Sequence, residues 1–228
     1  MKSLKYNLFV LAVLALAITP SFANSITIFG TGQGLGSGGV LDPNYQLIGG
    51  GPLGTLPPQL FTTPPFFGWI PASPGTQWIN PFGNTMNAPA GVYDYQTTFN
   101  LTGLNPLTAV LTGDFAADND AMIFLNGSFT TLKTMDRDGI PGNGFEQLTP
   151  FTISCPLGTC GTVGFLPGIN HLDFMVTNLL EGGNETPTGL EVEISGTASA
   201  TTPEPSSLLL MGTGVLGLAG VVRRKLVG

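Results

Sequence analysis

Charged residues are scarce in this chain, and positively charged ones are the scarcest. Only 9% of its 228 residues are charged, and seven of these are lysine or arginine. Between residues 24 and 205 the only basic residues are Lys133 and Arg137, whereas all fourteen acids of the chain fall in that stretch. A body this acidic repels phosphate backbones, so we exclude a nucleic-acid partner.

Histidine and cysteine are nearly absent as well. His171 is the single histidine, and it lies in a strand-like stretch beside Leu172 and Phe174, as a surface or structural strand residue would. No serine stands in a GxSxG motif, and two cysteines with one histidine are too few for a typical zinc site. Catalysis is therefore not expected of this chain.

Long apolar runs occur only at the two ends. The first 23 residues combine Lys2 and Lys5, an apolar core at 8–18, and small residues at Ser21 and Ala23. This pattern predicts a secretory signal helix, cleaved before Asn24, with the secretion translocon and signal peptidase as partners. In the oxidising compartment beyond the membrane, Cys155 and Cys160 are expected to form a disulfide that pins a local loop.

The other end, residues 201–228, has three parts in a fixed order. Pro203, Glu204 and Pro205 come first, an apolar run at 208–222 follows, and a basic stop closes it with Arg223, Arg224 and Lys225. As a helix the run would span about 22 Å against roughly 30 Å of hydrocarbon. It predicts a single short transmembrane helix whose basic residues stay in the cytoplasm, which places the preceding body outside.

This ordered trio closely resembles the PEP-CTERM sorting signal of Gram-negative bacteria. The resemblance implies an exosortase as processing partner, Glu204 between two prolines as the recognised element, and transient anchoring in the inner membrane. The body would then stand in the periplasm before release to the outer surface or an exopolysaccharide matrix. The alternative is an ordinary tail anchor behind a proline-rich linker.

The body between residues 24 and 200 has the alternation of an all-β protein. Tyr93, Tyr95, Thr97, Phe99 and Leu101 share one face of a predicted strand. Further strands are expected at 66–70, 77–79, 107–115, 121–125, 128–132, 145–155, 170–178 and 188–200, with 121–125 in a central position and a hairpin turn at 126–127. The sequence therefore predicts an antiparallel jelly-roll β-sandwich.

A second resemblance covers residues 91–200. The segments 95–99, 118–127, 168–174 and 188–192 are similar to the galactose-binding-like jelly rolls of bacterial surface and carbohydrate-active proteins. That resemblance implies the same sandwich fold and a role near polysaccharide.

Aromatic residues are frequent among the prolines and glycines of residues 49–90. Trp69 and Trp78 could form a platform on which sugar rings stack, which would make exopolysaccharide a partner. The other interpretation, which we favour, is that these aromatics cover an open end of the sandwich.

Four polar residues gather where a loop enters a strand. Asp114, Asp118, Asn119 and Asp120 could supply oxygen ligands to a structural Ca²⁺, the only cofactor we consider. Alternatively, Asp118 and Asn119 cap the turn through hydrogen bonds to the backbone, which is the interpretation we favour.

One pair of carboxylates leaves room for a different function. Glu191 and Glu193 alternate along one predicted strand and are both expected to face water. Such a pair is compatible with a secreted hydrolase acting on polysaccharide, but catalytic carboxylates usually face each other from different strands. We therefore predict an exported, non-catalytic structural or carbohydrate-binding protein of the envelope or matrix, with the hydrolase as the alternative.

Overall fold

The computed structural model describes residues 23–50, 59–83, 85, 87–134, 142–179, 185–201 and 205–227. The chain divides into two compact units. One runs from Ala23 to Ser199, and the other contains the C-terminal helix. Each is described by itself. The predicted signal peptide at 1–23 lies outside the described residues except for Ala23, which begins the first strand.

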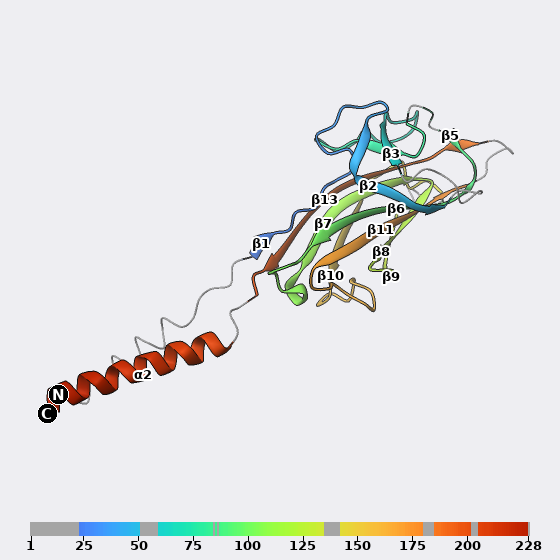
Figure 1. Cartoon of the computed structure of the whole chain (residues 1–228). Coiled ribbons are helices and arrows are strands. Elements are labelled where there is room, and N and C mark those ends of the chain that lie inside the picture. The colour runs from blue at the N-terminus through green and yellow to red at the C-terminus, as the bar shows by residue number, and fades with distance from the viewer. Residues whose placement is uncertain are drawn as a thin grey trace. The chain divides into compact units, whose positions relative to one another are not determined.

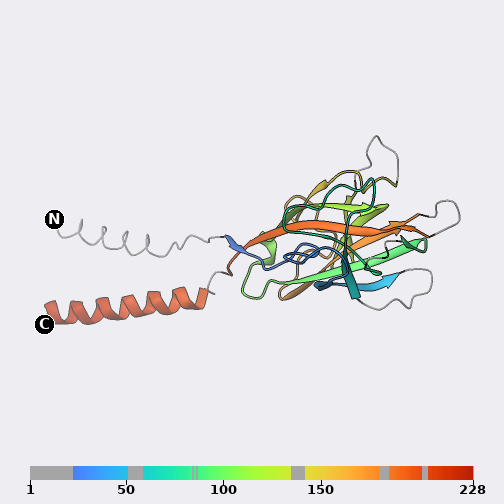
Figure 2. The same ribbon diagram turned by 90° about the horizontal axis from the view of Figure 1, so that it is seen from above.

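The body is built of antiparallel strands, drawn in Figure 1 and from above in Figure 2. In chain order they are β1 (Ala23–Ser25), β2 (Leu41–Gly50), β3 (Gln59–Thr63), β4 (Trp78–Asn80), β5 (Asn87–Ala88), β6 (Gly91–Asn100), β7 (Val110–Asp118), β8 (Asp120–Leu125), β9 (Ser128–Lys133), β10 (Thr149–Ser154), β11 (Ile169–Asn178), β12 (Thr186–Pro187) and β13 (Gly189–Ser199). A 3₁₀ turn, η1 (Pro106–Thr108), separates β6 from β7.

Hydrogen bonds connect the strands in the order β10-β7-β13-β4-β3-β2-β6-β11-β8-β9, with β1 added to β13. The two ends of this series face each other across the core. Phe115 of β7 and Phe151 of β10 meet Phe174 of β11, with ring centroids 5.9 and 6.4 Å from it. The result is a sandwich, so the predicted antiparallel all-β fold is confirmed.

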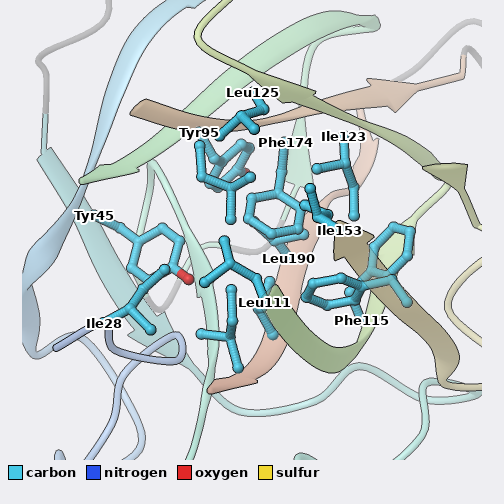
Figure 3. Close-up of a cluster of buried hydrophobic side chains, with 14 of the residues drawn as sticks. Ile28, Tyr45, Tyr95, Leu111, Phe115, Ile123, Leu125, Ile153, Phe174 and Leu190 are labelled. Atoms are coloured by element: carbon cyan, nitrogen blue, oxygen red, sulfur yellow. The ribbon is translucent and has the colours of Figure 1, made fainter. Parts of the chain in front are cut away.

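Strand alternation builds the core that Figure 3 shows. The five residues predicted to share the inner face of β6 and the residue after it are all buried. Their neighbours Asp94, Gln96, Thr98 and Asn100 point to the other side, where they are partly or fully exposed. Side chains alternate between the two faces of a strand. Burial of one set of residues therefore points the other set away from the core.

The hairpin between β8 and β9 follows its predicted turn. Asn126 and Gly127 have φ angles of 51° and 74°, the left-handed pair that a type I′ turn requires. The position of β8 differs from the prediction, however. It is the strand next to the edge, and Met122 on its outer face is exposed, so its second apolar face is not covered.

Residues 66–80 depart most from the prediction of short strands. Residues 77–79 belong mainly to β4, as expected, but 66–70 form a turn in which the Trp69 N–H donates to the Phe66 carbonyl at 3.0 Å. This segment lies on the outer face of β7, where Trp69 and Trp78 pack against Ala116 in a second apolar cluster. It therefore acts as a cover over one side of the sandwich.

The predicted disulfide between Cys155 and Cys160 is confirmed, with their Cα atoms 4.8 Å apart. It closes the turn that follows β10, where the Gly158 N–H donates to the Cys155 carbonyl at 2.9 Å. The bond thus pins a local loop, because the segment it encloses is short.

The C-terminal unit contains the helix α2 (Pro205–Val227). It includes the predicted run at 208–222 and continues through Arg223 and Arg224, whose side chains are exposed. Among the residues that the structure describes, no helix has the length and apolar character needed to cross a membrane. The predicted segment is helical, and its crossing of a membrane stays a prediction.

Candidate functional site

A small cleft of about 110 Å³ lies beside the turn between β7 and β8. Five aromatic or cyclic side chains form most of its wall, and polar residues from the ends of strands complete it: Phe66, Phe67, Trp69, Asp118, Asn119, Phe145, Thr186 and Pro187. The covering segment supplies the first three, the β7–β8 turn the next two, and β12 the last two. We call this site the aromatic cleft.

The Phe66–Trp69 turn gives the cleft one buried and one free aromatic surface. Phe67 is 95% exposed, and Phe66 beside it is partly exposed. The ring of Phe66 meets that of Trp69 edge to face, with centroids 6.4 Å apart. A free phenyl face next to a fixed aromatic ring is the kind of surface on which an apolar ring face of a ligand can stack.

Hydrogen bonds hold the polar side of the aromatic cleft in place. The Asp118 Oδ2 atom accepts from Trp69 Nε1 at 2.7 Å, and the Asp118 carbonyl accepts from Thr188 Oγ1 at 2.9 Å. Asn119 accepts at Oδ1 from the Leu179 N–H at 2.7 Å and donates from Nδ2 to the Gly142 carbonyl at 3.1 Å. The cleft is thus preorganised by contacts between segments distant in sequence.

The aromatic cleft combines apolar ring faces with few titratable groups. Its described lining contains one carboxylate, Asp118, and no basic side chain. Hydrolysis of a glycosidic bond ordinarily requires two carboxylates. Aromatic faces and one acidic acceptor can instead hold a ligand that has both an apolar face and hydroxyl groups.

The structure brings together three residues predicted for two separate sites. Trp69 was expected in a sugar platform and Asp118 and Asn119 in a calcium site, yet all three line one cleft. The platform prediction is wrong in its geometry, because Trp69 and Trp78 are both buried, with ring centroids 4.2 Å apart. Trp78 also donates from Nε1 to the Ile70 carbonyl at 3.0 Å. The free aromatic surface belongs to Phe67.

The predicted calcium ligands do not converge. Asp118 and Asn119 are buried and bonded to Trp69, Leu179 and Gly142. These partners are distant in sequence, so the two side chains join separate segments and do not cap their own turn. Asp120 accepts at Oδ1 from the Gly142 N–H at 3.3 Å. Asp114 stands apart on the outer face of β7, opposite Glu193, in another shallow groove. Among the described residues no three acidic, histidine or cysteine side chains are grouped to hold a metal ion.

The predicted water-facing pair of glutamates is also corrected. Glu193 is exposed, but Glu191 is completely buried beneath the covering segment. Its Oε1 atom accepts from the Ser73 N–H at 3.0 Å and from Thr76 Oγ1 at 2.6 Å. Burial raises the pKa of Glu191, although these hydrogen bonds oppose the shift. The two carboxylates therefore cannot serve as one open catalytic pair.

Sequence analysis missed Phe67 as the exposed aromatic residue of the site. Small residues on the neighbouring strands could have indicated that Trp69 is buried against them. A Cβ atom on Gly189 would stand 2.7 Å from Trp69 Cη2, and Ala116 leaves similar room on β7. Small side chains on the outer face of paired strands indicate that a large side chain covers them.

The sorting motif lies in the other unit. Pro203 and Glu204 are outside the described residues, and Pro205 is the first residue of α2. That position suits proline, whose missing N–H would have no partner within the helix. His171 is exposed on β11, as predicted for a surface histidine.

Comparison with known proteins identifies a PEP-CTERM protein-sorting motif at residues 201–225. The tail therefore carries the signal of an exported protein that an exosortase processes. No curated protein sequence matches the chain.

Two solved structures are similar to parts of the chain. A family 35 carbohydrate-binding module from an environmental isolate is 11% identical, with a TM-score of 0.33, covering 72% of this chain and 98% of that one. The ANXUR2 extracellular domain from Arabidopsis thaliana is also 11% identical, with a TM-score of 0.25, covering 49% of this chain and 33% of that one. The fold of the body rests on its own strand pairing.

Proposed function

We propose that this chain is an exported, non-catalytic carbohydrate-binding protein of the bacterial envelope or exopolysaccharide matrix, and that the aromatic cleft is its sugar site. The observation that carries the proposal is the exposed ring of Phe67 beside a cleft whose acidic acceptor, Asp118, is fixed by Trp69. A pyranose ring has an apolar face for the phenyl ring and hydroxyl donors for the carboxylate. The sorting motif supports a destination where such ligands occur.

A binding experiment tests the sugar site. Purified full-length protein is applied to an array of bacterial polysaccharides, and binders are then measured by calorimetry. Phe67→Ala should reduce the affinity about fivefold, because stacking on an aromatic ring contributes about 1 kcal/mol. Leu107→Ala removes another exposed apolar side chain, from η1 near the opposite end of β13, and should change nothing. Absence of binding to every glycan would refute the proposed role.

Sorting is a separate part of the proposal. The chain would be made with its signal at 1–23, retained at the inner membrane by its tail, processed near 203–205, and released beyond it. Glu204→Ala in the producing bacterium should leave unprocessed protein in the cell fraction, measured by size on immunoblots. The control is Glu193→Ala, which replaces an acidic residue outside the motif. Normal processing of the Glu204 variant would contradict the assigned role of that residue.

A further inference from the structure

The outer face of the strands β2, β6, β11, β8 and β9 presents one continuous row of side chains. Strand register places these five residues directly beside one another, one from each strand: Gln46, Gln96, Asp173, Phe124 and Phe129. At about 4.8 Å between strands, the row extends roughly 19 Å. A second row beside it contains Asp94, Met175, Met122 and Lys133. We call these two rows the sheet-face strip.

The half of the strip on β2, β6 and β11 is a hydrogen-bonded polar ladder. Gln46 Nε2 donates to Gln96 Oε1 at 3.1 Å, and Gln96 Nε2 donates to Asp173 Oδ1 at 2.7 Å. Asp173 is only 7% exposed although it lies on an outer face. The ladder therefore fixes the carboxylate of Asp173 before any ligand arrives.

Asp94 lies beside this ladder and is incompletely satisfied. Its Oδ1 atom is buried and has no hydrogen-bond partner among the described residues. Burial, followed by the charge of Asp173, raises the pKa of Asp94 to about 6. A buried polar atom without a partner is costly, and a donor supplied by a ligand would remove that cost.

The half of the strip on β8 and β9 is aromatic. The rings of Phe124 and Phe129 lie 5.3 Å apart with a tilt of 43°, and Phe129 is 41% exposed. Met122 adds a further exposed apolar side chain on β8. This half offers stacking surface directly next to the acidic half, because Phe124 is the strand neighbour of Asp173.

Charge restricts the ligands that the strip can accept. Asp94 and Asp173 lie on adjacent strands, and the only basic residue in the two rows is Lys133 on the edge strand β9. A uronic acid or a phosphorylated glycan would meet these two carboxylates. The described basic side chain that acts on Asp173 electrostatically is His171, two residues before it on β11. An ammonium group would instead be attracted to the carboxylates of Asp94 and Asp173.

We propose that the sheet-face strip binds a cationic glycan, a polymer of hexosamines with free amino groups. The ammonium groups lie at Asp94 and Asp173, and neighbouring sugar rings stack on Phe124 and Phe129. The row is long enough for several linked rings. This site is on another surface from the aromatic cleft and does not depend on it.

The test uses purified full-length protein and two matched oligosaccharides, the hexamer of glucosamine and the hexamer of N-acetylglucosamine. Calorimetry just above the pKa of Asp94, which is about 6, should show binding of the glucosamine hexamer, at least tenfold tighter than that of the acetylated one. Raising the salt concentration should weaken this binding, since it depends on exposed charges. Equal affinities for the two hexamers, or no binding of either, would overturn the proposal.

Four variants locate the interaction. Asp94→Asn and Phe129→Ala should each weaken binding of the glucosamine hexamer at least fivefold, while the melting temperature confirms that both remain folded. Glu193→Gln removes one negative charge from an exposed position on β13 and is the control for general attraction. An equal loss in the Glu193 variant would show that overall charge, and not the strip, holds the ligand. Retained affinity in Phe67→Ala would separate this site from the aromatic cleft, whereas a comparable loss there would assign binding to the cleft.

Discussion

The two outer faces of the sandwich place similar acidic side chains in environments of different solvent exposure. On β13, Glu191 is sealed beneath residues 66–80 and receives hydrogen bonds from Ser73 and Thr76. On β6, Asp94 stays partly exposed. Each of the two acids has one buried carboxylate oxygen without a partner among the described residues. Glu191 is sealed from solvent, whereas Asp94 is partly exposed. Substitutions on each face should therefore have different consequences.

Trp78→Ala should have the largest effect, because it removes the centre of the covered face. The side chain is fully buried against Trp69, and its loss should lower the free energy of unfolding by about 3–5 kcal/mol. Denaturation with urea measures this. Phe67→Ala is the matched aromatic control and should stay within about 0.5 kcal/mol of wild type. Similar losses in both variants would mean that Phe67 also belongs to the packed cover.

Gly189→Ala tests how closely the cover fits the strand below it. The added methyl group would stand 2.7 Å from Trp69 Cη2 and should cost about 1–3 kcal/mol. At Gly36 an added Cβ meets nothing within 4 Å, so Gly36→Ala should be nearly neutral. An unaffected Gly189 variant would indicate that the cover moves away easily from β13.

The same cover marks the limit of what sequence alone could predict. Alternation identified the inner face of β6 because each buried residue repeats at a spacing of two. The same alternation predicted that Glu191 faces solvent. That prediction failed because no local pattern shows that Ser73, 118 residues earlier, lies over it. The turn at Asn126 was predictable because its chemistry is local. Covering contacts between distant segments were not.

Glu191→Gln should show the buried carboxyl through pH. The pKa of Glu191 is raised mainly by burial, so the wild-type protein loses stability as pH rises from below 4.5 through the raised value. The neutral glutamine does not ionise. The variant should therefore match wild type at acidic pH and exceed it by about 1–2 kcal/mol at neutral pH, a typical cost for an unpartnered buried group. Urea denaturation at several pH values measures the difference.

A matched control is available one position along the same face. Glu193→Gln changes an exposed carboxylate and should leave the stability close to that of wild type across the same pH range. If the Glu191 variant gained nothing at neutral pH, the carboxyl would have to be compensated in its ionised form. The covered face would then not be a closed, apolar environment.

Asp94→Asn should give the smallest effect of the four, and its direction distinguishes the open face from the covered one. Burial and Asp173 raise the pKa of Asp94 from 3.8 to about 6, so wild-type stability should fall as pH rises through that interval. The asparagine variant does not ionise, so it should not show this fall and should melt higher than wild type above pH 6. The gain should be at most about 2 °C, because solvent screens a partly exposed group. Thermal melts between pH 4 and 8 measure the difference.

Since a cationic ligand favours the ionised form, the glucosamine hexamer should raise the melting temperature of wild type more than that of the Asp94→Asn variant. Equal stabilisation of both proteins would mean that Asp94 does not face the ligand, and the open face would lose the feature that separates it from the covered one.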